Sequence, residues 1–146
     1  MVSRDQLAAL AIVGLVLAAV VVGAVVYYSL RLHGHGTIKL VGLKAYSDPA
    51  ATLEVSAVDW GLIPPGGVSQ VLLYLKSTST TPANWTLTTE NWDPSAAQNF
   101  MVLTWDYDGG TLQPGEIRAV RFTLQVSVNI SAIVDFALDI VVTAAG

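Results

Sequence analysis

The sequence has 146 residues and no cysteine, only two histidines, and 12 % charged residues. Without cysteine the chain has no disulfide, no thiolate metal site and no cysteine nucleophile. Because the histidines are confined to His33 and His35, a Ser-His-Asp set would have to reach back to this one short segment. Neither an H-E-x-x-H motif nor a phosphate-binding glycine loop is present. We therefore expect no catalytic residues, no cofactor and no enzymatic activity.

Basic residues are also scarce. From residue 37 onward there are five Lys or Arg against ten Asp or Glu, and the whole chain has a net charge of −4. Nucleic-acid binding requires a basic patch that neutralises phosphates. A nucleic-acid partner is therefore not expected.

The low charge content reflects a run of 24 uncharged, mostly apolar residues at positions 7–30. As a helix it would extend about 36 Å, enough to cross a hydrocarbon core of about 30 Å. The run is longer than a signal-peptide core. It ends with Tyr27 and Tyr28 near its last residues and is followed by Arg31, and these residue types suit a membrane interface. The sequence thus predicts a retained single-pass transmembrane helix, with a cleaved signal and a pilin-type helix as alternatives. The predicted segments are a tail (1–6), the transmembrane helix (7–30), a Gly/His joint (31–36) and one domain (37–146).

Small residues recur along this helix in two small-xxx-small pairs, Gly14 with Ala18 and Ala19 with Gly23. Such pairs permit close helix–helix approach, although Gly and Ala are common in membrane helices anyway. They are our candidates for packing against another protein helix.

The orientation of the chain in the membrane rests on opposing signals. Arg31, Lys39 and Lys44 follow the helix and, by the positive-inside tendency, favour a cytoplasmic domain. The domain has only three lysines, and it carries two N-x-S/T glycosylation motifs, at Asn84 and Asn129. We expect an extracytoplasmic domain.

After the expected joint, the chain is typical of short strands separated by Pro/Gly turns. The clearest strand is 134–143, in which Phe136, Leu138, Ile140 and Val142 alternate with polar residues. In 52–60, four alternate residues are expected to share one face of the strand, namely Leu53, Val55, Ala57 and Asp59. The pattern predicts an all-β, antiparallel, Ig-like β-sandwich of about seven strands. The expected strands are 37–45, 52–60, 68–76, 85–90, 101–107, 117–126 and 134–143.

Two short segments support a resemblance. Residues 59–66 read D-W-G-L-I-P-P-G, and residues 91–94 read N-W-D-P. With the N-terminal helix, they resemble a group of archaeal single-pass membrane surface proteins that have an Ig-like sandwich of ASH- or CARDB-like type. The layout is more loosely similar to archaeal type IV pilins, but Asp5 stands where their processing site has a small residue. The resemblance implies the fold and a surface location, and it implies no activity.

Three features are candidates for small sites. Asp106 and Asp108, in W-D-Y-D-G-G, resemble the start of a calcium loop, although Asp-Gly is more typical of a hairpin turn. His33 and His35 could bind a metal, but no third ligand lies near them in sequence. Of the four tryptophans we expect two in the core. We leave Trp85 and Trp92 open, with Trp85 better suited to a surface loop because it lies within a glycosylation motif.

The leading functional hypothesis is a non-enzymatic, membrane-anchored cell-surface module that acts through protein–protein contacts, either with itself or within a membrane complex. Its partners would be the lipid bilayer and other protein subunits, and exposed strand edges could accept a strand from another chain. The alternatives are a pilin-like filament subunit, a small accessory subunit of a membrane complex, and a calcium- or glycan-binding domain.

Overall fold

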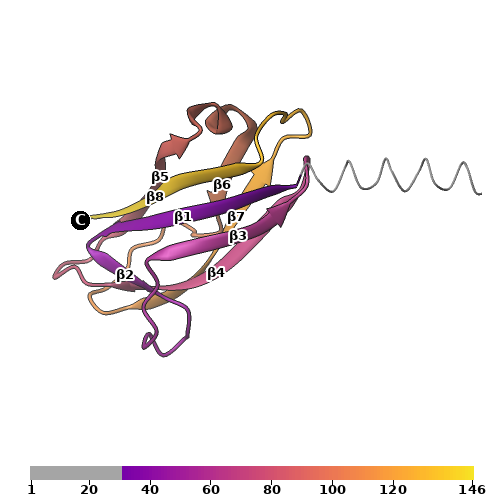
Figure 1. Ribbon diagram of the computed structural model, residues 1–146. Coiled ribbons are helices and arrows are strands. Elements are labelled where there is room, and N and C mark those ends of the chain that lie inside the picture. The colour runs from indigo at the N-terminus through magenta and orange to yellow at the C-terminus, as the bar shows by residue number, and fades with distance from the viewer. Residues whose placement is uncertain (1–30) are drawn as a thin grey trace, which may run out of the picture.

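The computed structural model describes residues 31–146, which form two four-stranded sheets packed as a β-sandwich (Figure 1). The fold is all-β as predicted, with eight strands rather than about seven and one short 3-10 helix, η1 (Ser95–Phe100), which the sequence did not predict. The strands are β1 (Leu32–Val41), β2 (Leu43–Tyr46), β3 (Ala57–Ile63), β4 (Val68–Ser77), β5 (Asn84–Asp93), β6 (Met101–Trp105), β7 (Ile117–Val126) and β8 (Asp135–Ala145).

The predicted membrane helix lies outside the described residues. So do its four packing candidates, Gly14, Ala18, Ala19 and Gly23. Within residues 31–146, no helix is long and apolar enough to cross a membrane.

The first sheet has the order β3-β1-β8-β5 and the second has the order β2-β4-β7-β6. All strand pairs are antiparallel except β1 with β8, which run parallel from His33–Asp135 to Val41–Thr143. The expectation of a purely antiparallel sandwich is therefore wrong at this pair. This pair places the first and the last strand side by side at the centre of one sheet.

The core lies between the two sheets and follows from period-two alternation. In β8 the four predicted inward residues, Phe136, Leu138, Ile140 and Val142, are all at most 2 % exposed. In β7 the same alternation buries Val120 and every second residue after it. Three of the four tryptophans belong to the buried core, namely Trp60, Trp85 and Trp92.

Residues 32–36 are part of β1, so the predicted flexible joint is wrong. Strand alternation turns Gly34 and Gly36 toward the core and leaves His33 and His35 on the outer face. A Cβ on Gly36 would lie 3.0 Å from Ile140 Cδ1 and 3.3 Å from Trp60 Nε1. The glycines in H-G-H-G therefore make room for core side chains and do not serve as a flexible joint.

The predicted strand 52–60 is displaced to 57–63, and its inward face is formed by Val58, Trp60 and Ile63. The four residues expected to share one face are exposed or part-exposed, namely Leu53, Val55, Ala57 and Asp59. The preceding loop is held by the Asp48 carboxylate, which accepts hydrogen bonds from the N–H groups of Thr52 and Leu53 at 2.7–3.1 Å. Residues 53–55 then bond to the segment around β2, where Ser47 N–H donates to Leu53 O and Val55 N–H donates to Ala45 O, both at 2.9 Å, and the pairing of β3 with β1 begins at Ala57.

The two motifs that carried the family resemblance form two irregularities in the edge strands of one sheet. In β3 the register against β1 shifts at Trp60 and Gly61, and Gly61 has φ of 70°. In β5 the register against β8 shifts after Glu90, and Asn91 has φ of 52°. Each irregularity places one tryptophan in the core, Trp60 or Trp92, beside a residue with left-handed backbone.

Candidate functional site

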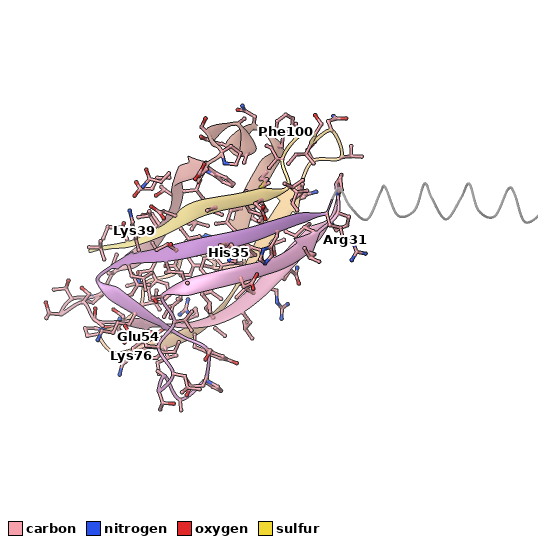
Figure 2. All side chains as sticks on the ribbon, in the orientation of Figure 1. Arg31, His35, Lys39, Glu54, Lys76 and Phe100 are labelled. Carbon is pink, nitrogen blue, oxygen red and sulfur yellow. The ribbon has the colours of Figure 1, made fainter. Side chains whose placement is uncertain are left out.

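His33, His35 and Asp59 form a cluster on the outer face of the β3-β1-β8-β5 sheet. One nitrogen of each imidazole and one carboxylate oxygen all lie within 4.8 Å of one another. His33 Nε2 is 3.3 Å from Asp59 Oδ1, and the two imidazole rings meet edge to face with centroids 4.4 Å apart. Figure 2 labels His35 between Arg31 and Lys39 along β1. The two histidines therefore belong to the sandwich, and the third ligand that the local sequence lacked comes from β3.

The geometry of this cluster follows from strand alternation and from the irregularity in β3. Residues two apart in a strand share a face, which puts both imidazoles on the same side of β1. The register shift then pairs His35 with Asp59 rather than with Trp60. Gly61 N–H donates a hydrogen bond of 2.9 Å to Asp59 Oδ1, which fixes the carboxylate. This hydrogen bond, followed by the charges of the two imidazoles, lowers the pKa of Asp59.

The calcium candidates Asp106 and Asp108 are engaged in other contacts. Asp106 Oδ1 accepts the backbone N–H of Arg121 at 2.7 Å. Asp108 Oδ1 accepts from Gly110 N–H at 2.8 Å and from Arg118 Nη1 at 3.1 Å. Among residues 31–146, the cluster at His33 is the one group of three His, Cys, Asp or Glu side chains with ligand-like spacing, and neither aspartate belongs to it. The structure thus gives the D-x-D-G segment the contacts of a turn that is anchored to β7.

The two glycosylation motifs have different surroundings. The Asn84 side chain donates to Gly109 O at 2.7 Å and accepts from Thr111 Oγ1 at 3.1 Å, so its amide is already bonded at both ends. Asn129 is exposed in the turn between β7 and β8. Of the two motifs, the one at Asn129 leaves its amide more accessible.

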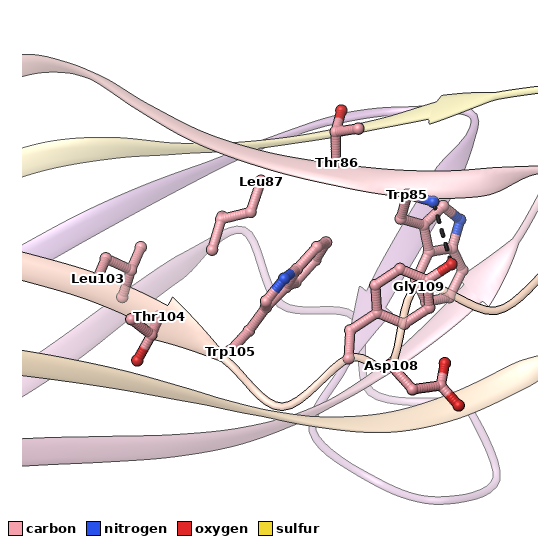
Figure 3. Close-up of a pocket in the computed structure, with 9 residues that line it drawn as sticks. Trp85, Thr86, Leu87, Leu103, Thr104, Trp105, Asp108 and Gly109 are labelled. Atoms are coloured by element: carbon pink, nitrogen blue, oxygen red, sulfur yellow. Dashed lines mark hydrogen bonds between the residues drawn. The ribbon is translucent and has the colours of Figure 1, made fainter.

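An aromatic groove lies between the edge strands β5 and β6, where the two sheets are open to each other (Figure 3). Its walls include Trp85, Trp105 and Tyr107. The centroid of the Tyr107 ring is 5.5 Å from that of Trp85 and 5.0 Å from that of Trp105. The Tyr107 hydroxyl accepts the backbone N–H of Trp85 at 3.3 Å and donates to Gly110 O. Trp85 is only 3 % exposed, so its predicted surface-loop location is wrong. These rings close the open side of the sandwich.

The outer faces of the two sheets differ in charge. On the β3-β1-β8-β5 sheet, which we call the acidic face, five outward carboxylates stand against the single ammonium of Lys39. On the β2-β4-β7-β6 sheet, which we call the basic face, the outward strand positions hold three cations and no carboxylate, and Glu54 and Asp106 lie at its borders. The acidic face carries Asp59, Glu90, Asp93, Asp135 and Asp139, and the basic face carries Lys44, Lys76 and Arg121.

The basic face is also the more apolar of the two. Val68, Leu72, Val102 and Ile117 project from its strands, with exposed fractions between 38 % and 60 %. Val68 and Val102 flank the same β7 residue, Gln125, and Leu72 pairs with Arg121. Aliphatic side chains interspersed with a few cations are what a docking surface for an acidic protein partner requires.

No protein-family model and no curated protein sequence matches this chain. Its function has to be inferred from its own residues.

Proposed function

We propose that this chain is a non-enzymatic, membrane-anchored surface module that acts through protein–protein contacts, and that its partner on the basic face is the acidic face of a second copy. The membrane anchor is the uncharged run at 7–30, and one residue, Arg31, separates that run from β1. The sandwich would then sit close to the bilayer, on its extracytoplasmic side, and we propose that it is Ig-like, with two four-stranded sheets.

The observation that carries the proposal is the opposite charge of the two outer faces. Complementary faces steer association and fix its register, and apolar side chains between the charges supply buried area. A contact between the two different faces is heterologous, so it repeats from copy to copy instead of closing as a two-fold dimer. Rows of anchored sandwiches on a surface would result.

Strand addition at the sheet edges is a less favoured mode of contact. Irregularities interrupt both edge strands of the acidic sheet, at Gly61 in β3 and at Asn91 in β5. In the other sheet the edge strands β2 and β6 have only four and five residues. Interrupted and short edges are the means by which β-proteins avoid pairing with further strands. Contact through the sheet faces is therefore the favoured mode of association.

Sedimentation of the full-length chain in detergent micelles tests the proposal. We expect association at low ionic strength that weakens as salt is added, because salt screens exposed charges. Reversing the basic face with Lys76→Glu and Arg121→Glu should abolish association, and so should reversing the acidic face with Glu90→Lys and Asp135→Lys. An equimolar mixture of the two double variants should associate again.

A loop variant, Thr80→Glu with Ser131→Glu, adds acidic charge at exposed positions outside both faces and should behave as wild type. Association that persists unchanged at high salt would instead point to the Gly14/Ala18 and Ala19/Gly23 pairs in segment 7–30. A chain that is monomeric at every salt concentration, or a mixture that fails to restore association, would refute contact through the faces.

A pilin-like filament subunit is the second candidate, because a heterologous contact that does not close generates helical filaments. The N-terminus of the mature chain distinguishes the filament subunit from the anchored module. An intact Met1 in the native membrane fraction supports the anchored module, whereas a chain that starts near Gln6 or Leu7 in high-molecular-weight surface material supports the filament subunit. Stoichiometric co-purification with other membrane proteins would support the third candidate, an accessory subunit.

A further inference from the structure

We propose that His33, His35 and Asp59 form a surface site for one divalent transition metal ion, and that Zn²⁺ is the ion that matches it best. The site lies on the acidic face, but the residues and distances that support it do not depend on the face-to-face contact proposed above. It is assembled from two strands that lie side by side, since His33 and His35 belong to β1 and Asp59 belongs to β3.

The donor set selects the class of ion. Two imidazole nitrogens and one carboxylate oxygen suit borderline ions such as Zn²⁺, Ni²⁺ and Cu²⁺, whereas Ca²⁺ and Mg²⁺ prefer all-oxygen sites. Three protein ligands leave a tetrahedral ion one position for water or for a group from a partner. The set is therefore chemically complete for a zinc ion with one open position.

The distances are close to those that zinc requires. With metal–ligand bonds of about 2.0–2.1 Å, the ligand atoms of a tetrahedral site are about 3.3 Å apart. The distance from His33 Nε2 to Asp59 Oδ1 is 3.3 Å, and all three ligand atoms lie within 4.8 Å of one another. His35 is exposed, so its side chain has room to move toward the other two ligands when an ion binds.

Metal binding accounts for two features that an ion pair between His33 and Asp59 leaves unexplained. An ion pair uses one histidine, whereas here both imidazoles converge on the same carboxylate, with His35 paired to Asp59 across the strands. The bulge at Trp60 and Gly61 is what aligns Asp59 with His35, and Gly61 N–H donates to Asp59 Oδ1, the oxygen that faces His33 Nε2. Hydrogen bonds that orient a ligand in this way are typical of metal sites.

The surroundings favour a cation as well. Asp135 pairs with His33 from β8, on the side opposite β3, and exposes a further carboxylate on the same face. The acidic face as a whole attracts divalent cations. A bound ion would join β1 to the edge strand β3 at the irregularity, close to the segment that we propose enters the membrane.

Titration of the tag-free, full-length chain in micelles with ZnCl₂, followed by calorimetry, tests the site. We expect one saturable Zn²⁺ per chain and no binding of Ca²⁺. His35→Asn and Asp59→Asn should each weaken Zn²⁺ binding at least about tenfold, as loss of a ligand requires. Asp59→Asn keeps an oxygen that can accept the Gly61 hydrogen bond, so the local fold should survive. Asp135→Asn on the neighbouring strand is the matched control and should retain the stoichiometry.

A spectroscopic readout identifies the ligands directly. Because the sequence has two histidines, imidazole NMR spectra contain two sets of signals, and Zn²⁺ should shift both. Absence of saturable binding to the wild-type chain would overturn the proposal. So would Asp59→Asn binding as tightly as wild type, because two histidines alone would then account for the metal.

Discussion

The Phe136 ring covers the backbone of Gly34, so that a Cβ atom on Gly34 would lie 2.1 Å from Phe136 Cζ. Gly34→Ala should therefore lower the free energy of unfolding by at least about 1–3 kcal/mol, the usual cost of overpacking a core. Gly36→Ala should cost less, because its nearest neighbour would be 3.0 Å away. Chemical denaturation measures both, with the exposed Thr37→Ala as the control. Equal stability of all three variants would show that β1 does not pack as described.

The register of β3 can be tested with a charge on either face. Val58→Asp should unfold the domain, because Val58 is 6 % exposed and an unpaired buried carboxylate is costly. Ala57→Asp places the same group on the exposed side and should leave circular dichroism and thermal stability nearly unchanged. The opposite result would show that Ala57 rather than Val58 faces the core and would contradict this register.

Acid stability should depend on Asp139. Asn91 Nδ2 donates to Asp139 Oδ2 at 2.7 Å and Lys39 Nζ is 2.8 Å from the same oxygen, and these contacts lower the pKa of Asp139. A carboxyl with a lowered folded-state pKa stabilises the fold above its unfolded-state value of about 3.9, and the effect is lost as the pH falls through the folded-state pKa.

Asp139→Asn should therefore reduce stability at pH 7 and flatten the decline of stability as the pH falls below about 4, relative to wild type. Denaturation midpoints across this range provide the measurement. Asp135→Asn removes a carboxylate from the same strand and face without touching this pair, and it should keep the wild-type slope. An unchanged slope in Asp139→Asn would show that the contacts do not form in solution.

Glycosylation, in a host that exports and glycosylates the chain, should occur at Asn129 rather than at Asn84. Modification of Asn84 would disturb the hydrogen bonds to Gly109 and Thr111, whereas Asn129 is exposed in a turn. Peptide mass spectrometry reports the occupancy of each motif, and Asn129→Gln should remove the modification. A glycan on Asn84 in the folded protein would contradict the expected preference.

Sequence patterns were sufficient where a strand is regular. The bounds of β7 and the inward residues of β8 follow from uninterrupted alternation over ten residues. The same rule explains why Trp85 was misplaced, since in a strand a buried residue can stand between two exposed ones, here Asn84 and Thr86. A glycosylation motif says nothing about the face of its middle residue.

Sequence patterns failed where pairing between distant segments decides the geometry. Asp59 meets His33 and His35 because of a one-residue shift in the β1–β3 register, which period-two alternation does not encode. The D-W-G segment contained a usable signal, because glycine inside a strand often marks a bulge. The parallel pairing of β1 with β8 likewise depends on which strands become neighbours.

That parallel pair has a mechanical consequence. The C-terminus lies at the end of the sandwich opposite the start of β1 (Figure 1). If the chain is held at its N-terminus, a pull on the C-terminus draws β1 and β8 past each other along their common axis. Nine consecutive paired positions would then bear the load together, in shear, instead of separating one after another. The parallel pair of β1 and β8 would thus resist tension applied between the two ends of the sandwich.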